Sequence, residues 1–195
     1  MKKELIVIGA GGHAASCIDV IEEEATYKIV GLVDNDSSLK NLKGYAFMGN
    51  DEDLKNLRKN YENAFIAIGQ MKSHKKRLNL YKNLKELKYN LPNIISPNSY
   101  TSKRSKIGKG TIVMHGCIIN SGVNIGENCI INSMSLLEHD VSIGNNCHIS
   151  TNVKINGNCI IGSNTFIGSG SVIKENTKIK ADSYLKMFSR IVDDI

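Results

Sequence analysis

A six-residue repeat dominates the second half of the chain. From Ile107 to Tyr184 the sequence divides without a slip into thirteen units, with Ile, Val or Leu in the first position and Thr, Cys, Val or Ser in the fifth. A period of six is not helical and matches a parallel β-helix, in which each unit forms one flat side and one corner and three units make a coil of about eighteen residues. The repeat therefore predicts a prism of about four coils, whose first and fifth positions point inward.

The other positions of the repeat support this interpretation. Gly and Asn are frequent at the turning positions, because corners need a permissive backbone. Four of the five cysteines occupy the fifth position, namely Cys117, Cys129, Cys147 and Cys159, and are expected to be small buried core residues. The chain has no CxxC pair, so no zinc site is expected, and the odd number of cysteines argues against disulfides.

The first ninety residues have a different pattern. Short apolar runs at 4–8, 27–33 and 64–69 are typical of strands, and helical spacing appears at 14–24, 54–60 and 71–88. Strands that alternate with helices predict a small Rossmann-like α/β domain with a parallel sheet. Two prolines interrupt the pattern between residues 91 and 97. The predicted domains are therefore 1–92 and 93–195.

A glycine-rich loop follows the first predicted strand. Gly9, Gly11 and Ala14 match the loose form G-x-G-x-x-A, and Asp34 lies about twenty positions further on, as in dinucleotide-binding folds. Backbone amides at a helix start can hold phosphate. Ninety residues make only half of a full dinucleotide domain, so one nucleotide is easier to house than two. In the alternative interpretation, the glycines only make a tight turn.

Composition narrows the class of partner. The net charge of +6 is consistent with an anionic small molecule or with a generic basic surface. Nucleic acid is disfavoured, because the lysines are scattered and no aromatic stacking platform accompanies them. No apolar run approaches the roughly 18 residues of a membrane span. The first apolar run is also too short for a signal peptide, so the predicted location is cytoplasmic.

Four segments carry a resemblance to a known family. The stretches VIGAGGHA, FIAIG, LLEHDVSIG and HISTNVKINGN look like the sialic-acid O-acetyltransferase family, which includes the bacterial UDP-4-amino-sugar N-acetyltransferases. The resemblance covers residues 4 to about 175. It implies a left-handed parallel β-helix, a homotrimer with active sites between adjacent prisms, and acetyl-CoA as the cosubstrate without a metal.

The resemblance also implies a catalytic group. His139 would be the general base, and it occupies the third position of its unit, near a corner, from which it projects outward. A neutral imidazole suits the removal of a proton from an acceptor amine or hydroxyl. Asp140 would be its carboxylate partner, where a glutamate is common, although Glu138 could serve instead. Asn132 falls at a position that lines the site.

The remaining site residues are assigned in the same way. The backbone N–H of Gly157 would stabilise the oxyanion, and His148 is a second candidate for contact with the thioester carbonyl or the acceptor, across a subunit boundary. Coenzyme A would also touch Phe166 and Ser169. His115 is expected to be structural or to line the acceptor side, and His74 to be solvated. The nucleotide of the acceptor would be held by Gly12, His13, Asp34, Asn35 and Gly69.

Three functions follow, in order of preference. The first is an acetyl-CoA-dependent acetyltransferase acting on a nucleotide-linked amino sugar or a sialic-acid-like nonulosonic acid. The second is a non-catalytic, nucleotide-sugar-binding trimer, suggested because the chain looks shortened or diverged after about Lys174 and lacks the family's Gly- and Pro-containing tail. The third, a nicotinamide-dependent oxidoreductase, depends on Gly9 and Gly11 alone.

Overall fold

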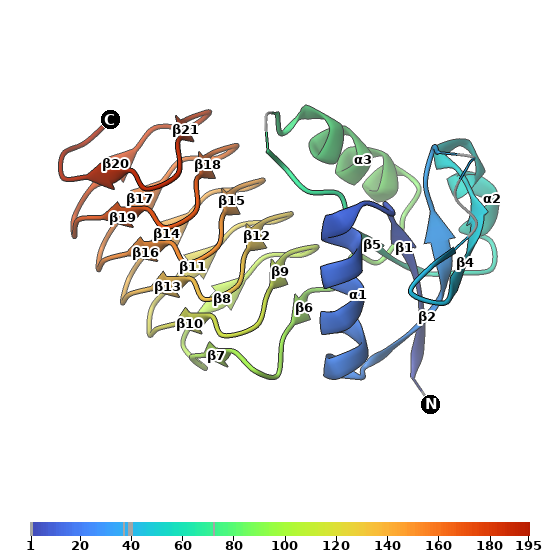
Figure 1. Ribbon diagram of the computed structural model, residues 1–195. Helices are drawn as coiled ribbons and strands as arrows, with labels where there is room; N and C mark the ends of the chain where they lie inside the picture. The colour runs from blue at the N-terminus through green and yellow to red at the C-terminus, as the bar shows by residue number, and fades with distance from the viewer. Residues whose placement is uncertain (1, 37, 39–40, 72) are drawn as a thin grey trace. The chain divides into compact units, whose positions relative to one another are not determined.

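The computed structural model describes residues 2–36, 38, 41–71 and 73–195. The chain divides into two compact units (Figure 1). The first comprises Met1–Gly69 and Lys75–Pro92, and the second Gln70–His74 and Asn93–Ile195. The segment Gln70–His74, which the predicted boundary assigns to the first domain, thus groups with the second unit.

The first unit contains a five-stranded sheet in the order β3-β4-β2-β1-β5. Four strands are parallel, and β3 pairs with β4 in the antiparallel direction. The strands are β1 (Lys3–Ile8), β2 (Tyr27–Val33), β3 (Asn41–Leu42), β4 (Tyr45–Gly49) and β5 (Asn63–Ile66). The sequence did not predict β3 or β4, which lack a buried apolar run.

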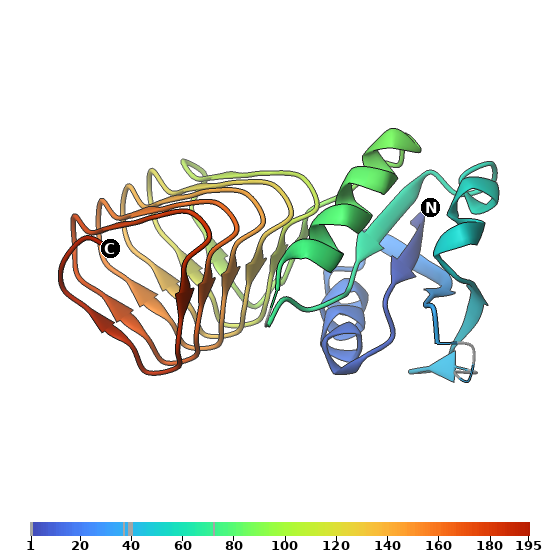
Figure 2. The same ribbon diagram turned by 90° about the horizontal axis from the view of Figure 1, so that it is seen from above.

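Helices cover both faces of this sheet. They are α1 (Gly12–Glu24), α2 (Leu54–Leu57, preceded by the 3-10 turn η1, Asp51–Asp53) and α3 (Lys75–Glu86). Figure 2 shows α1 and α3 on opposite faces. Leu80 and Leu84 of α3 pack with Ile6 and Ile8 of β1 in one buried cluster. The predicted helix over 71–88 begins only at Lys75, because Gln70–His74 belongs to the other unit.

The second unit is a left-handed parallel β-helix with three parallel sheets (Figure 1). Sheet I contains β6 (Ile94–Ile95), β9 (Ile112–Val113), β12 (Ile130–Ile131), β15 (His148–Ile149), β18 (Phe166–Ile167) and β21 (Tyr184–Leu185). Sheet II contains β7 (Tyr100–Thr101), β10 (Ile118–Ile119), β13 (Leu136–Leu137), β16 (Lys154–Ile155), β19 (Val172–Ile173) and β22 (Arg190–Ile191). Sheet III contains β8 (Lys106–Ile107), β11 (Asn124–Ile125), β14 (Ser142–Ile143), β17 (Ile160–Ile161) and β20 (Lys178–Ile179).

The core of the prism follows the repeat. First-position residues such as Ile131, Leu137 and Ile143 are buried together with the fifth-position residues of the same coils. The four fifth-position cysteines are at most 1% exposed, which confirms that they are core residues. Paired residues in neighbouring strands are eighteen positions apart, as in the pair Ile131 and Ile149. The chain runs through sheets I, II and III in turn, so we name the corners I/II, II/III and III/I.

The prism extends beyond the repeat that the sequence predicted. It begins with β6 and β7, before Ile107, and β20, β21 and β22 pair with the coil below them. The chain was expected to be shortened or diverged after about Lys174. Residues 178–191 do complete a further coil, and this stretch lacks Gly and Pro, as the sequence shows. One corner residue of this coil is Phe188, where Gly or Asn is usual. The repeat was therefore not recognised in the sequence beyond Tyr184.

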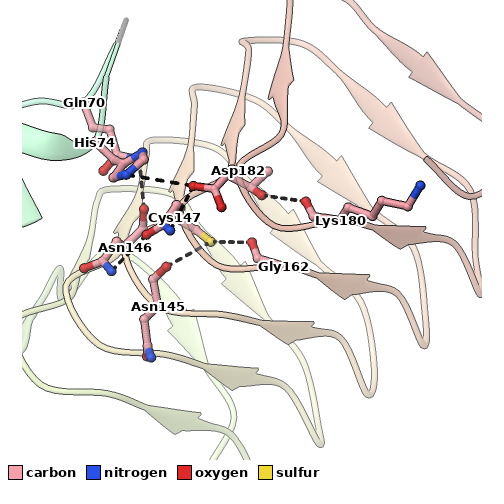
Figure 3. A network of polar contacts seen from close by, with 10 residues as sticks. Gln70, His74, Asn145, Asn146, Cys147, Gly162, Lys180 and Asp182 are labelled. Atoms are coloured by element: carbon pink, nitrogen blue, oxygen red, sulfur yellow. Dashed lines mark hydrogen bonds and ion pairs between the residues drawn. The ribbon is translucent and has the colours of Figure 1, made fainter.

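Gln70 and His74 lie against the III/I corner of the prism (Figure 3). The side-chain amide of Gln70 donates to the carbonyl of Asn146 at 2.8 Å, and the carbonyl of Gln70 accepts from Nδ1 of His148 at 2.6 Å. Nε2 of His74 lies 3.9 Å from Oδ1 of Asp182, and the His74 side chain is 23% exposed. His74 is therefore partly buried, contrary to the expectation that it is solvated.

Candidate active site

His139 and Asp140 form a pair at the II/III corner, directly after β13. Nδ1 of His139 donates to Oδ2 of Asp140 at 2.9 Å, and the two side chains are 66% and 64% exposed. Because an ionised carboxylate only accepts hydrogen bonds, this contact fixes the proton on Nδ1. In the neutral ring, Nε2 then has the free lone pair, which is the arrangement that a general base needs.

The backbone of Asp140 explains how the contact is made. Asp140 has a φ of 60°, in the left-handed region, which Asp tolerates better than most residues because its short polar side chain can bond locally. This conformation brings the carboxylate back to the ring of the preceding residue. The aspartate side chain is therefore long enough to reach Nδ1 of His139.

Glu138 forms a hydrogen bond with a residue other than His139. Its Oε2 accepts a hydrogen bond from the side-chain amide of Asn120, one coil below, at 3.0 Å. Of the two carboxylates that the sequence offered as partners of His139, the structure brings only Asp140 into contact with the imidazole.

Gly157 lies directly against the ring of His139. A Cβ atom added at Gly157 would come within 2.6 Å of both Cε1 and Nε2 of His139. Its φ is not in the left-handed region, so glycine is needed here for space and not for backbone conformation. The structure thus places the predicted oxyanion donor beside the predicted base.

Asn132 and Ser169 lie at another corner of the prism. Asn132 precedes β13 at the I/II corner, where its Oδ1 accepts the backbone N–H of Ser133 at 2.9 Å. Ser169 is at the same corner, with its hydroxyl 2.8 Å from that of Ser150. His115 also lies there, with Nδ1 2.6 Å from the Ser96 hydroxyl. Within one chain, the width of sheet II separates these residues from the corner of His139.

His148 and Phe166 lie in a third place, on the outward side of sheet I. The rings of His148 and Phe166 meet edge to face at 5.2 Å, and Phe166 stacks on Tyr184 at 4.9 Å. His148 is only 4% exposed, because Gln70 lies over it. His148 is therefore not a surface histidine. Gln70 and Tyr184 were missed by sequence reasoning, although Tyr184 is eighteen residues from Phe166.

The predicted nucleotide residues gather at the carboxyl edge of the sheet in the first unit. Gly12 and His13 begin α1, and Gly11 caps this helix without a side-chain hydrogen bond. Among the described residues, and apart from the adjacent residues and the backbone of α1 itself, no atom lies within 4 Å of a Cβ added at Gly11 or Gly12. Gly69 is next to His13, since its added Cβ would lie 3.6 Å from the Cβ of His13. The open helix start is a suitable place for phosphate.

Asp34 and Asn35 brace this edge. Oδ2 of Asp34 accepts the N–H of Ala10 at 2.8 Å, and Oδ1 accepts the N–H of Asp36 at 3.0 Å. The side-chain amide of Asn35 donates to Asp51 at 2.8 Å. The carboxylate of Asp34 therefore holds the glycine loop in position through its acceptor atoms.

Residues 2–36, 38, 41–71 and 73–195 contain no group of three or more His, Cys, Asp or Glu side chains that could hold a metal ion. Among the same residues, no helix is long and apolar enough to cross a membrane.

Comparison with known proteins identifies the class. Residues 4–84 match the model of the PglD N-terminal domain, and residues 140–175 match the bacterial transferase hexapeptide repeat. The chain is a hexapeptide-repeat acyltransferase with a PglD-type N-terminal domain. No curated protein sequence matches this acyltransferase significantly.

Solved structures resemble the acyltransferase over its whole length. A histidine-to-asparagine variant of perosamine N-acetyltransferase from Caulobacter crescentus, in complex with CoA and GDP-perosamine, is 27% identical, with a TM-score of 0.93 over 98% of this chain and 90% of that one. The acetyltransferase domain of PglB from Neisseria gonorrhoeae is 26% identical, with a TM-score of 0.93 over 100% and 93%. WeeI from Acinetobacter baumannii, at 19% identity and a TM-score of 0.76 over 97% and 94%, shares the fold.

Proposed function

We propose that this acyltransferase moves the acetyl group of acetyl-CoA to the amine of a nucleotide-linked amino sugar. The strongest support is that the similarity spans both units of proteins whose structures hold CoA with GDP-perosamine, or acetyl-CoA. The carboxyl-edge loops of the first unit would hold the nucleotide. The prism would hold the coenzyme. A protein that only binds a nucleotide would have no need for a coenzyme site.

The reaction needs one base and one oxyanion donor. The amine nitrogen attacks the thioester carbonyl carbon, and its proton passes to Nε2 of His139. Asp140 stabilises the imidazolium that forms, and the N–H of Gly157 donates to the oxyanion. When the C–S bond breaks, the proton moves from His139 to the departing sulfur, which gives CoA as the free thiol and the acetamido sugar.

The assembly proposed for this reaction is a trimer. The outward side of sheet II carries three apolar side chains, Tyr100, Ile118 and Val172, which are from 39% to 60% exposed, together with Lys154 and Arg190. The outward side of sheet III carries one exposed apolar side chain, Ile160 at 47%, among Lys106, Asn124 and Lys178. An exposed apolar face favours self-association.

Threefold packing through sheet II would also complete the site. It brings the II/III corner of one copy, with His139, next to the I/II corner of the next copy, with Asn132 and Ser169. The separation of Asn132 from His139 within one chain is then expected. His148 and Phe166 lie on sheet I, and their contact with coenzyme A stays a prediction. The cytoplasmic location also stays a prediction.

The test is a panel of acceptors with acetyl-CoA. Nucleotide-linked 4-amino sugars with uracil, guanine or thymine bases, and sialic acids as the oxygen acceptors, are incubated with the enzyme. Thiol release is followed, and the products are identified by mass spectrometry. We expect acetylation of at least one nucleotide-linked amino sugar and none of the free acids. Acetylation of a sialic acid alone would overturn the proposal.

The non-catalytic alternative depended on a tail that is shortened or diverged. The tail forms β20, β21 and β22, so its coil is present, while its sequence still lacks Gly and Pro. Calorimetry that finds nucleotide-sugar binding without acetyl-CoA binding would support this alternative.

A further inference from the structure

The fourth position of the repeat has one backbone conformation throughout the prism. Every fourth-position residue from Gly110 to Phe188 has a positive φ in the left-handed region. Most of these residues are Gly or Asn, which adopt this region most easily. The corners differ in the hydrogen bonds that the fourth-position side chains make.

At the III/I corner the fourth-position side chains form a ladder. Asn128 donates to Asn146 at 2.9 Å, Asn146 to Asn164 at 3.2 Å, and Asn164 to Oδ1 of Asp182 at 3.0 Å. Each member bonds to the residue eighteen positions away, one coil up. An aspartate in this ladder, Asp182, accepts its hydrogen bond from the asparagine below it.

At the II/III corner the ladder is broken beneath the active-site aspartate. Asn158 and Asn176 are linked at 2.8 Å in the usual way. The residue one coil below Asp140 is Gly122, which has no side chain to donate. A Cβ added at Gly122 would collide with Oδ1 of Asp140, so the carboxylate occupies the space that a side chain at position 122 would fill.

We propose that Gly122 is a positioning residue for the His139–Asp140 pair. The empty fourth position lets the carboxylate of Asp140 lie back over Gly122 and turn to Nδ1 of His139. An asparagine at this position, the usual residue elsewhere in the prism, would force the carboxylate to move and would draw it into a ladder like that of Asp182. This inference rests on the proposed role of His139.

The choice of glycine is therefore not explained by the backbone alone. Asparagine also adopts the left-handed region, as Asn146 and Asn158 do here. A Gly122→Asn variant should consequently fold and keep its stability, while the orientation of the imidazole is lost. Stability and catalysis then separate, which a purely structural role would not predict.

The experiment is a double-mutant cycle with Gly122→Asn and Asp140→Asn. We expect Gly122→Asn to lower kcat at least about tenfold, within the range for disturbed general-base catalysis, with the KM for acetyl-CoA and the melting temperature little changed. In the Asp140→Asn background, Gly122→Asn should have no further effect on kcat. Equal effects of Gly122→Asn in both backgrounds would overturn the inference.

A second measurement does not depend on activity. Nitrogen-15 NMR of histidine-labelled protein reports which ring nitrogen carries the proton, and the His139 signals are assigned by their loss in His139→Asn. We expect the proton on Nδ1 in the wild type and a mixture of tautomers in Gly122→Asn. The same tautomer in both proteins would overturn the inference. If the tautomer shifts but the wild type acetylates no acceptor, the positioning role stands and the proposed function fails.

Gly122→Ala is a second variant, which we expect to fold with a lowered melting temperature, because alanine is disfavoured in the left-handed region that Gly122 adopts. Its Cβ meets the same carboxylate without adding a hydrogen-bond donor. The same loss of the Nδ1 tautomer is expected, and its retention would overturn the inference.

Discussion

At the scale of single residues, two glycines position the imidazole of His139, because they have no side chains. Gly157 leaves room for the ring, and Gly122 leaves room for the carboxylate that orients it. The pairing of His139 with Asp140 was expected from the resemblance, and the structure shows their contact, while their catalytic roles stay predictions. Gly122 was missed, although its signal was available as the residue eighteen positions before Asp140.

Replacing Gly157 by Ala tests the first of these spaces. The added methyl group would displace the ring, and the left-handed region is not involved, so the backbone is not strained. We expect kcat to fall about tenfold to a hundredfold, as for lost positioning in general acid–base catalysis, with an unchanged melting temperature. The measurement is steady-state kinetics with thermal unfolding.

The control for this variant is the same substitution in the His139→Asn background. Without the imidazole, Gly157→Ala should lose most of its effect on kcat. An equal loss in both backgrounds would show that the added methyl group acts on something other than the ring of His139.

At the scale of the repeat unit, the fifth position needs more than small size. Thiol and hydroxyl groups there donate to a carbonyl of the next coil, fifteen residues on, as Cys129 does to Gly144 at 3.2 Å and Ser135 to Ser150 at 2.9 Å. Position and size could be predicted from the repeat. The hydrogen bonds could not, since valine also occupies this position and donates nothing.

The thiols should therefore be unreactive in the folded protein. Burial raises the pKa of Cys17 to about 12 and that of Cys117 to about 11, and the thiolate is the reactive form. We expect almost no reaction of the native protein with a disulfide reagent at pH 8, and reaction of all five cysteines after unfolding. Rapid labelling of a native thiol would contradict the assignment of these residues to the core.

The asparagine ladder makes a separate prediction about stability. Asn146→Ala removes two side-chain hydrogen bonds at a 9% exposed site and places Ala in the left-handed region. We expect a loss of about 2–4 kcal/mol in the free energy of unfolding, from the cost of the left-handed conformation and of unpaired partners.

Asn152→Ala is the matched control. Asn152 has the same φ of 56° but is exposed at the I/II corner, so it should lose only about 1–2 kcal/mol, the conformational part. Denaturant unfolding of both variants decides the question. Equal losses would show that the ladder adds nothing.

At the scale of the whole molecule, the repeat predicted the prism but not its ends. Thr101 interrupts the aliphatic first position near the start, and Phe188 takes a left-handed corner near the end, so neither end looked regular. The resemblance implied a site between adjacent prisms, and the separation of His139 from Asn132 on two corners of one chain is consistent with such a site. The site is complete only if a second copy of the chain supplies the other corner.

Ile118→Lys tests the proposed packing through sheet II. A lysine on this 44% exposed site costs the single chain little, but three buried charges would oppose a trimer. We expect the mass in solution, measured by light scattering, to fall from three chains to one, with loss of acetyl transfer. Ile160→Lys on sheet III should stay trimeric, and loss of the trimer in this variant alone would contradict the choice of face.

The central claim is that His139 removes the proton from the acceptor amine. Its most direct test is the kcat of His139→Asn, compared with the wild type, for acetyl transfer from acetyl-CoA to the preferred nucleotide-linked amino sugar. The account predicts a loss of about a hundredfold to ten-thousandfold, the usual contribution of a general base, with the Kd for acetyl-CoA unchanged. A variant that keeps more than about a tenth of the wild-type kcat, well above that range, would contradict it.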